Sequence, residues 1–148
     1  GFSPLSGLTM GTRAGEIDAG AVLHLVSTLG AGAATHMLYH DSGLLGLSGL
    51  SADMRTLEQS TSPQAQFARD HFCYWIARQA GAMIAAMQGI DGIAFTGGIG
   101  ENDAAIRNNV LAQLSWLGNI PAWVIPAAEE QQIARDAITL LKDHKNAP

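Results

Sequence analysis

The amino-acid sequence predicts an α/β fold in which mostly parallel strands are flanked by helices. Two short apolar runs, residues 92–96 (GIAFT) and 122–125 (AWVI), are bounded by turn residues as buried strands commonly are. Helical segments precede, separate and follow these runs, and helices that alternate with strands indicate parallel pairing. The 148 residues are 47% hydrophobic, enough for one buried core, so we expect a single domain over residues 1–148.

The first part of the chain predicts loops and short helices. Residues 1–18 contain four glycines, which disfavour a helix, so we expect an ordered loop there. Apolar residues recur at three- and four-residue spacing over residues 19–29, with Asp18 as a cap, which predicts a helix. A second short helix is expected over residues 33–39. Residues 42–51 (SGLLGLSGLS) alternate small residues with leucines, and we expect a buried loop packed by those leucines.

The longest helix is predicted after Ser62 and Pro63, a cap followed by a proline at the first helical position. It should end near Gln88 and Gly89. Its apolar stripe is predicted to comprise Phe67, Phe72, Trp75, Ile76, Met83, Ile84 and Met87. The only cysteine, Cys73, lies in this segment, where we expect a small buried thiol that forms no internal disulfide.

The last third predicts a strand, a glycine loop over residues 97–101, and a helix over about 103–117. A second strand over 122–125 is stopped by Pro126. A closing helix over about 128–142 would place Ile133, Ala134, Ile138 and Leu141 on one face.

Charge and patterning exclude several classes of function. The net charge is −5 and no run of Lys or Arg occurs, so a nucleic-acid partner is not expected. The apolar stretches are too short for a membrane span, and we expect a cytoplasmic protein without a membrane partner. The five histidines lack metal-ligand spacing, and no Ser or Cys stands on a nucleophile elbow.

The turn after the first strand, residues 95–102 (FTGGIGEN), carries the strongest local signal for a ligand. Glycines let the backbone approach a bound group, and the amides of a following helix favour an anion or a polar group. The turn is not a P-loop, because no Lys-Ser/Thr pair follows, and Asp103 prevents a complete G-x-G-x-x-G. A plain tight connection explains three glycines equally well.

Three charged sites have both a functional and a structural interpretation. Arg13, among small residues, could bind a phosphate or carboxylate with two hydrogen bonds, could be solvated, or could pair with Glu16 or Asp18. Asp53 is placed as a helix cap and Arg55 as a solvent-facing charge. Glu129 and Glu130 would stand in the first turn of a helix, where its dipole favours carboxylates without any metal.

Four stretches, read in order, together point to one family: GFSPLSGLTMGTRAGEID, SGLLGLSGLSADMRTLE, FCYWIARQAGAMIAAMQGIDGIAFTGGIGEN and VIPAAEEQQIARDA. They resemble the acetate and propionate kinases of the acetokinase family. The resemblance implies the fold shared by actin, heat-shock chaperones and sugar kinases, in which two ribonuclease-H-like domains clasp a nucleotide. This chain would be the incomplete C-terminal, nucleotide-binding domain.

The resemblance also implies a reversible reaction in which ATP and acetate or propionate give ADP and an acyl phosphate, with Mg²⁺. Arg13 matches the catalytic arginine that stabilises the transferring phosphoryl group. Glu129 matches the Mg²⁺-associated glutamate. The positions that match nucleotide-contacting segments are Asp53, Met54, Arg55, Gly98, Ile99, Gly100, Glu101 and Asn102.

The sequence departs from the family pattern in ways that bear on function. The family's N-terminal domain, with further catalytic groups and most of the acyl pocket, is expected to be a missing partner, so the chain alone should be inactive. The connection over 117–122 is short, and Ala127 and Ala128 replace a usual Thr-Asn pair. Family members are generally homodimers through this part. A nucleotide-binding or regulatory module without catalysis, or a structural remnant, is the alternative, and acetate is not distinguished from propionate.

Overall fold

The computed structural model describes residues 1–145 of the chain, with side chains to residue 141. The elements follow one another in this order: α1 (Ala19–Leu29), α2 (Ala31–His40), α3 (Gly43–Ser48), α4 (Met54–Gln59), α5 (Pro63–Met87), β1 (Ile93–Phe95), α6 (Gly97–Asn102), α7 (Ala104–Gln113), a 3₁₀ turn (Ser115–Leu117), β2 (Ala122–Val124) and α8 (Glu129–Lys145). Within the described residues, no helix is both long and apolar enough to cross a membrane.

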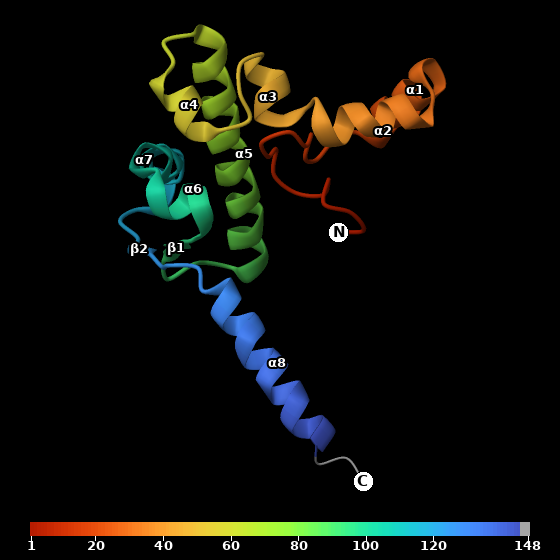
Figure 1. The fold of residues 1–148 in the computed structure, drawn as a ribbon. Helices are drawn as coiled ribbons and strands as arrows, with labels where there is room; N and C mark the ends of the chain where they lie inside the picture. The colour runs from red at the N-terminus through yellow and green to blue at the C-terminus, as the bar shows by residue number, and fades with distance from the viewer. Residues whose placement is uncertain (146–148) are drawn as a thin grey trace.

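The long helix α5 is the centre of the molecule, and α3, α4 and α7 pack against it (Figure 1). The buried core contains Leu44, Met54, Leu57, Ala65, Ala68, Phe72, Cys73, Ala77, Ile106, Val110 and Leu114. The small residues of α5 let its neighbours approach closely. Phe72 confirms part of the predicted apolar stripe, but Phe67, Met83 and Met87 are exposed, so the stripe is only partly covered.

Helix starts follow the predicted capping side chains. Asp18 accepts a hydrogen bond from the Ala21 amide, and Ser62 accepts one from Gln64 ahead of the 25-residue α5. Asp103, expected inside a helix over 103–117, instead caps α7 by accepting from the Ile106 amide, and this helix ends at Gln113. Each side chain satisfies an amide that has no partner inside its helix, which explains why these boundaries can be predicted from local sequence.

The sheet described here has two parallel strands, β1 and β2, as the alternation of elements predicts. Ile93 pairs with Ala122 and Phe95 with Val124. The prediction that 122–125 is a buried strand is wrong, because every residue of β2 is exposed. No other described element covers its faces to any extent, so its apolar side chains remain on the surface.

Two segments predicted as loops are short helices. The leucine-rich run 42–51 contains α3, and the glycine turn 97–101 lies in α6. Glycine disfavours helix formation locally, but additional hydrogen bonds compensate, from outside the helix in α3 and from side chains of the helix itself in α6. Carbonyls of residues 10–12 accept from amides at the start of α3, and the side chains of Glu101 and Asn102 bond back to Gly97 and Gly98 in α6.

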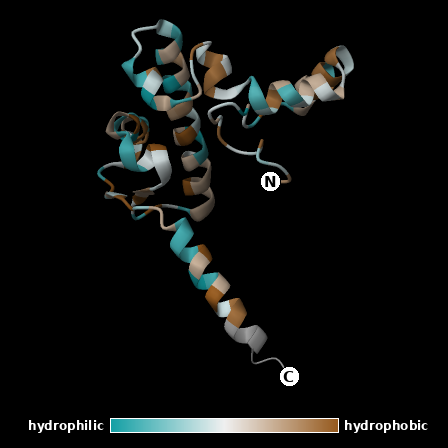
Figure 2. Ribbon diagram, viewed as in Figure 1, coloured by the Kyte–Doolittle hydropathy of each residue, from teal (hydrophilic) through white to brown (hydrophobic). Residues whose placement is uncertain are grey.

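Two parts extend from the body. The hairpin of α1 and α2 projects on one side, and α8 projects beyond β2 (Figure 1). The apolar positions of α8 are spread along its exposed surface (Figure 2), and Ile133, Ile138 and Leu141 are each more than half exposed. The helix is where the sequence predicts it, but no described residue covers its apolar side chains.

Candidate functional site

The loop that carries Arg13 is fixed by backbone hydrogen bonds to the start of α3. The Ser42 amide donates to the Thr12 carbonyl at 3.0 Å, and the Leu44 amide donates to Met10 at 2.8 Å. A third bond, from Leu45 to Gly11, measures 2.9 Å. These contacts supply acceptors for amides that α3 itself leaves unpaired. They hold the backbone that precedes Arg13, and the Ala14 amide, which donates to the Leu38 carbonyl of α2 at 3.0 Å, holds the backbone that follows it.

The same loop is tied to α5 through His71. The Thr9 hydroxyl donates to the Ala14 carbonyl at 3.1 Å, so its single proton is used there. His71 Nε2 lies 3.2 Å from that hydroxyl oxygen and therefore donates to it. Burial lowers the pKa of His71, which favours the neutral ring with its proton on Nε2. The loop is consequently anchored on two helices.

Gly43 is required where the loop and α3 meet. Its φ is +66°, in the left-handed region. A Cβ at this position would lie 2.1 Å from the Met10 carbonyl oxygen and 2.9 Å from both the backbone nitrogen and the carbonyl oxygen of Arg13. The absence of a side chain at Gly43 therefore sets how closely the Arg13 backbone can approach.

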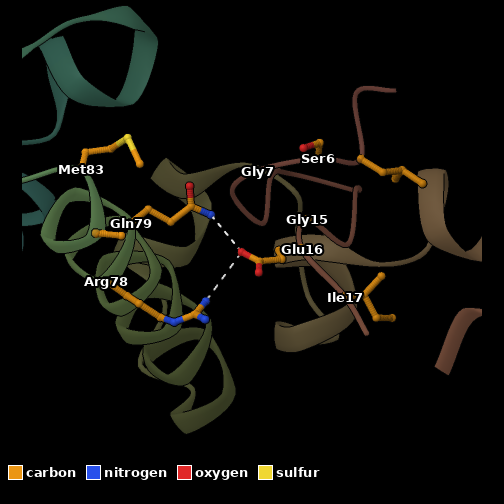
Figure 3. A pocket seen from close by; sticks show the side chains of 10 residues that line it. Ser6, Gly7, Gly15, Glu16, Ile17, Arg78, Gln79 and Met83 are labelled. Atoms are coloured by element: carbon orange, nitrogen blue, oxygen red, sulfur yellow. Dashed lines mark hydrogen bonds and ion pairs between the residues drawn. The ribbon is translucent and has the colours of Figure 1, made fainter. Parts of the chain in front are cut away.

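The side chain of Arg13 is exposed, in contrast with its fixed backbone. Among the described residues it forms no ion pair, so the predicted alternatives with Glu16 and Asp18 do not occur. Glu16 instead lies 3.6 Å from Arg78 and 3.5 Å from Gln79 in a pocket of about 610 Å³ beside the loop (Figure 3). The Arg13 guanidinium is thus available to a ligand.

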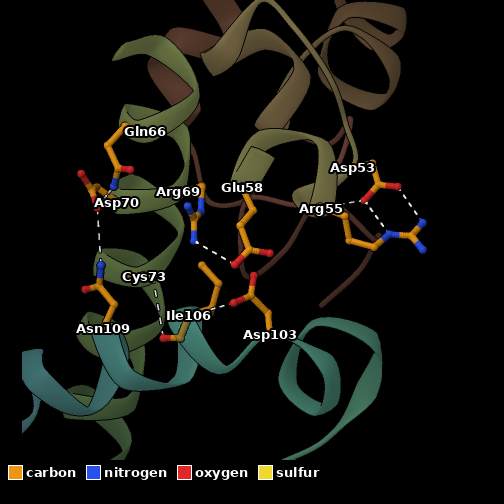
Figure 4. A network of polar contacts seen from close by, with 10 residues as sticks. All are labelled: Asp53, Arg55, Glu58, Gln66, Arg69, Asp70, Cys73, Asp103, Ile106 and Asn109. Atoms are coloured by element: carbon orange, nitrogen blue, oxygen red, sulfur yellow. Dashed lines mark hydrogen bonds and ion pairs between the residues drawn. The ribbon is translucent and has the colours of Figure 1, made fainter. Parts of the chain in front are cut away.

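The segment 53–55 begins beside this loop. Its preceding residue, Ala52, contacts the loop closely, since a Cβ on Gly11 would be 3.0 Å from the Ala52 carbonyl oxygen. Asp53 caps α4, as predicted, and also binds Arg55 at 2.7 Å (Figure 4). The Arg55 guanidinium lowers the pKa of Asp53 through this hydrogen bond. Met54 is buried in the core, so only its backbone could contact a nucleotide.

The glycine turn and Glu129 come together at a second place. A pocket of about 320 Å³ is lined by Gly97, Gly98, Glu101, Ala127, Ala128, Glu129 and Glu130. The Gly97 amide donates to Glu101 Oε1 at 2.8 Å, so this amide already has a carboxylate partner inside the protein. The anion that the sequence predicts at this helix start is therefore supplied, at Gly97, by the chain itself.

Arg107 was not singled out by the sequence, yet it fixes the other end of α6. Its Nη1 donates to the carbonyls of Gly100 and Glu101, both at 2.9 Å. A cation that binds the last carbonyls of a helix is favourable there. The signal that could have identified it is an arginine one turn after a helix that ends on Asn-Asp.

The structure thus forms two groups of candidate residues. Arg13 lies with the segment 53–55, and Gly98 and Glu101 lie with Glu129. No hydrogen bond or ion pair among the described residues joins the two groups. The described residues also contain no group of three or more His, Cys, Asp or Glu placed to hold a metal ion, so Glu129 could be only one of several Mg²⁺ ligands.

Similarity to solved structures defines the structural class of the protein. The chain superposes on an acetate kinase from Porphyromonas gingivalis with a TM-score of 0.87 at 32% identity, covering 95% of this chain and 42% of the other. A propionate kinase from Francisella tularensis matches with a TM-score of 0.82 at 33% identity, covering 88% and 40%. The fold is therefore that of the sugar-kinase and actin class of ATPases, as predicted.

Sequence similarity then identifies the family. Residues 1–135 match the model of the Acetokinase family. The chain is 44% identical to an acetate kinase from Nitrobacter hamburgensis over 169 residues, covering 99% of this chain and 42% of the relative. It is 42% identical to an acetate kinase from Rickettsia akari, covering 95% and 42%. The chain belongs to the acetokinase family, and it spans about 42% of the length of these curated relatives.

The alignment with the Nitrobacter relative is longer than this chain, since 169 exceeds 148. The relative therefore contains internal residues that have no counterpart here. This agrees with the short connection noted between residues 117 and 122, where the structure has only a 3₁₀ turn and a few residues before β2.

Proposed function

We propose that this chain is the C-terminal, nucleotide-binding part of a short-chain carboxylate kinase. The reaction transfers the γ-phosphoryl group of ATP to acetate or propionate and gives ADP and an acyl phosphate, reversibly. The observation that carries the proposal is the family match over residues 1–135, together with relatives named acetate kinase. The free buried thiol of Cys73 is compatible with a reducing, cytoplasmic setting.

Arg13 would stabilise the transferring phosphoryl group. Phosphoryl transfer depends mainly on positioning and on neutralising the charge that builds up on the equatorial oxygens. The backbone before Arg13 is held by α3, the Ala14 amide after it donates to the Leu38 carbonyl of α2, and the guanidinium is exposed, an arrangement suited to a preorganised cationic group. The planar guanidinium can donate to two oxygens at once and stays charged.

The nucleotide would be bound by two segments. Arg55 is exposed and Asp53 is half-buried beside the Arg13 loop, and Gly98 has open space where a side chain would otherwise stand. A ribose or base could approach the backbone of residues 98–102 closely for that reason. Met54 would contribute through its backbone alone, since its side chain is buried.

The residues present could supply only part of the coordination shell of a Mg²⁺ ion. This ion usually keeps several waters and binds one or two carboxylates together with substrate phosphates. Glu129 offers one exposed carboxylate at the pocket that also contains Glu101, so it could complete such a shell. When bound with ATP, Mg²⁺ would neutralise charge on the phosphate oxygens.

The remaining catalytic groups would come from the part of the relatives that this chain does not span. We propose that this part forms an N-terminal domain across the nucleotide, that residues 1–148 form the C-terminal domain, and that the working enzyme is a homodimer. The exposed β2 and the exposed apolar positions of α8 support the idea that more protein covers this chain.

The test is to complete the chain and measure its product. The N-terminal part of the Nitrobacter acetate kinase, joined ahead of residue 1, should yield a protein that converts MgATP and acetate or propionate to acyl phosphate, trapped as the hydroxamate. The chain alone should bind MgADP by calorimetry without turnover. Nucleotide binding without turnover in the completed protein would favour a module that has lost catalysis, and absence of both would reject the proposal.

A further inference from the structure

Glu101 joins two segments that lie far apart in the sequence. Its Oε1 accepts hydrogen bonds from the Gly97 amide and from the Ala127 amide, both at 2.8 Å. A carboxylate oxygen has two lone-pair sites, so this oxygen is fully occupied by the protein itself. Bonds from neutral amides to a charged acceptor are stronger than bonds between neutral groups. The side chain is also half-buried, which shields it from water.

The contact with Ala127 is the last tie between the body and α8. The Ile125 amide donates to the Phe95 carbonyl at 2.8 Å, and Pro126 then has no amide to donate. Every residue of α8 from Glu129 to Leu141 is exposed, so packing does not fix this part of the helix. Among the described residues, no hydrogen bond after Ala127 reaches outside the start of α8 and the helix itself. Glu129 follows only two residues later.

We propose that Glu101 is a positioning residue that latches the segment carrying Glu129 to the glycine turn, and so sets the distance between the nucleotide loop and the Mg²⁺-side glutamate. The inference rests on the proposed function for the role of Glu129. In this proposal, the Glu101 carboxylate bonds to backbone amides of the chain and does not contact the nucleotide directly. The effect of Glu101 would pass through the Ala127 amide to Glu129.

Four variants distinguish a positioning role of Glu101 from direct binding of nucleotide or metal. Glu101→Ala removes the acceptor, whereas Glu101→Gln keeps an oxygen that can accept both bonds. Ala127→Pro removes the second donor without changing Glu101. Ala128→Pro is the matched control, because it adds a proline one residue later, where the amide has no hydrogen-bond partner among the described residues.

Amide hydrogen exchange in the 148-residue chain tests directly whether the Gly97 and Ala127 amides are held by Glu101. The Gly97 and Ala127 amides should be protected in the wild type and in Glu101→Gln. Both should exchange at least tenfold faster in Glu101→Ala, while Gly97 should stay protected in Ala127→Pro. Unprotected Ala127 in the wild type would overturn the latch, and so would protection that survives in Glu101→Ala.

Kinetics of the completed enzyme test the consequence. Glu101→Ala and Ala127→Pro should each raise the Mg²⁺ concentration for half-maximal rate about tenfold, roughly what one charge-assisted hydrogen bond supplies. The rate at saturating Mg²⁺ should change little, and the double variant should be no worse than either single one. Glu101→Gln should fall between the wild type and Glu101→Ala, because its neutral oxygen keeps both hydrogen bonds without the charge assistance. Ala128→Pro should stay near the wild type.

Three results would contradict the inference: additive effects in the double variant, an Ala127→Pro enzyme that behaves like Ala128→Pro, or a Glu101→Gln enzyme as impaired as Glu101→Ala. The last would point to a charge-dependent contact with substrate or metal. If the completed wild type makes no acyl phosphate, the proposed function fails, and the exchange experiment still decides whether the latch exists.

Discussion

The two ends of the candidate site are held in different ways. The Arg13 loop is bound by backbone hydrogen bonds from α3 and by His71 of α5, both parts of the central body. The segment that leads to Glu129 depends on one exposed strand and on the Glu101 side chain. The chain therefore orders the backbone that carries its cationic group by itself, whereas placing the metal-side carboxylate requires either the Glu101 contact or a covering surface.

The largest expected effect concerns Arg13 and tests whether its loop is the catalytic part of the site. In the completed enzyme, Arg13→Ala should lower kcat by about 10²–10³, the loss seen when one preorganised group that stabilises transition-state charge is removed. Arg13→Lys should recover only part of it, because an ammonium keeps the charge and loses the two-pronged geometry. The hydroxamate assay under saturating MgATP measures both.

Arg135→Ala is a suitable control for that experiment, because Arg135 is exposed on α8 and lies outside both candidate groups. It should leave kcat unchanged. An Arg13→Ala enzyme with wild-type kcat would show that the ordered loop serves the fold and not the phosphoryl group.

The second prediction concerns the stability of the ordered end, and two glycines offer a matched pair. Gly43 and Gly49 have φ of +66° and +62°, but only Gly43 has backbone atoms where a Cβ would stand. Gly49→Ala should cost about 1 kcal/mol for the left-handed conformation alone. Gly43→Ala should cost roughly 3 kcal/mol or more, because the clash with Met10 adds to the conformational cost.

Urea unfolding of the 148-residue chain gives both free energies of unfolding. In the completed enzyme, Gly43→Ala should also lower kcat, since the displaced backbone belongs to Arg13, while Gly49→Ala should not. Equal losses of stability in the two variants would mean that the contact between α3 and the loop is looser than the structure indicates.

The sequence predicts those features whose signal is local. Asp18 and Ser62 each cap a helix by bonding an amide two or three residues away, so the boundaries are visible in the sequence itself. The parallel pairing of β1 and β2 follows from the alternation of elements. The cap at Asp53 likewise needs only neighbouring residues.

The features that escape prediction depend on contacts between distant segments. The glycines of α3 argue against a helix, and the carbonyls of the distant residues 10–12 reverse that preference. The exposure of β2 is another case, because its composition shows that it is apolar but not what covers it. Anchors such as His71 and Gly43 were missed for the same reason: nothing near them in the sequence indicates the Arg13 loop.

The smallest predicted effect compares the two ends directly by limited proteolysis. Trypsin can cut after Arg13 or after Arg135, and both side chains are exposed. Cleavage requires the backbone around the site to open, so its rate follows the local free energy of opening. Opening at Arg13 must break the bonds to α3, whereas opening at Arg135 disrupts only the turns of an exposed helix. Cleavage after Arg135 should therefore be at least about tenfold faster, as judged by mass spectrometry of early time points.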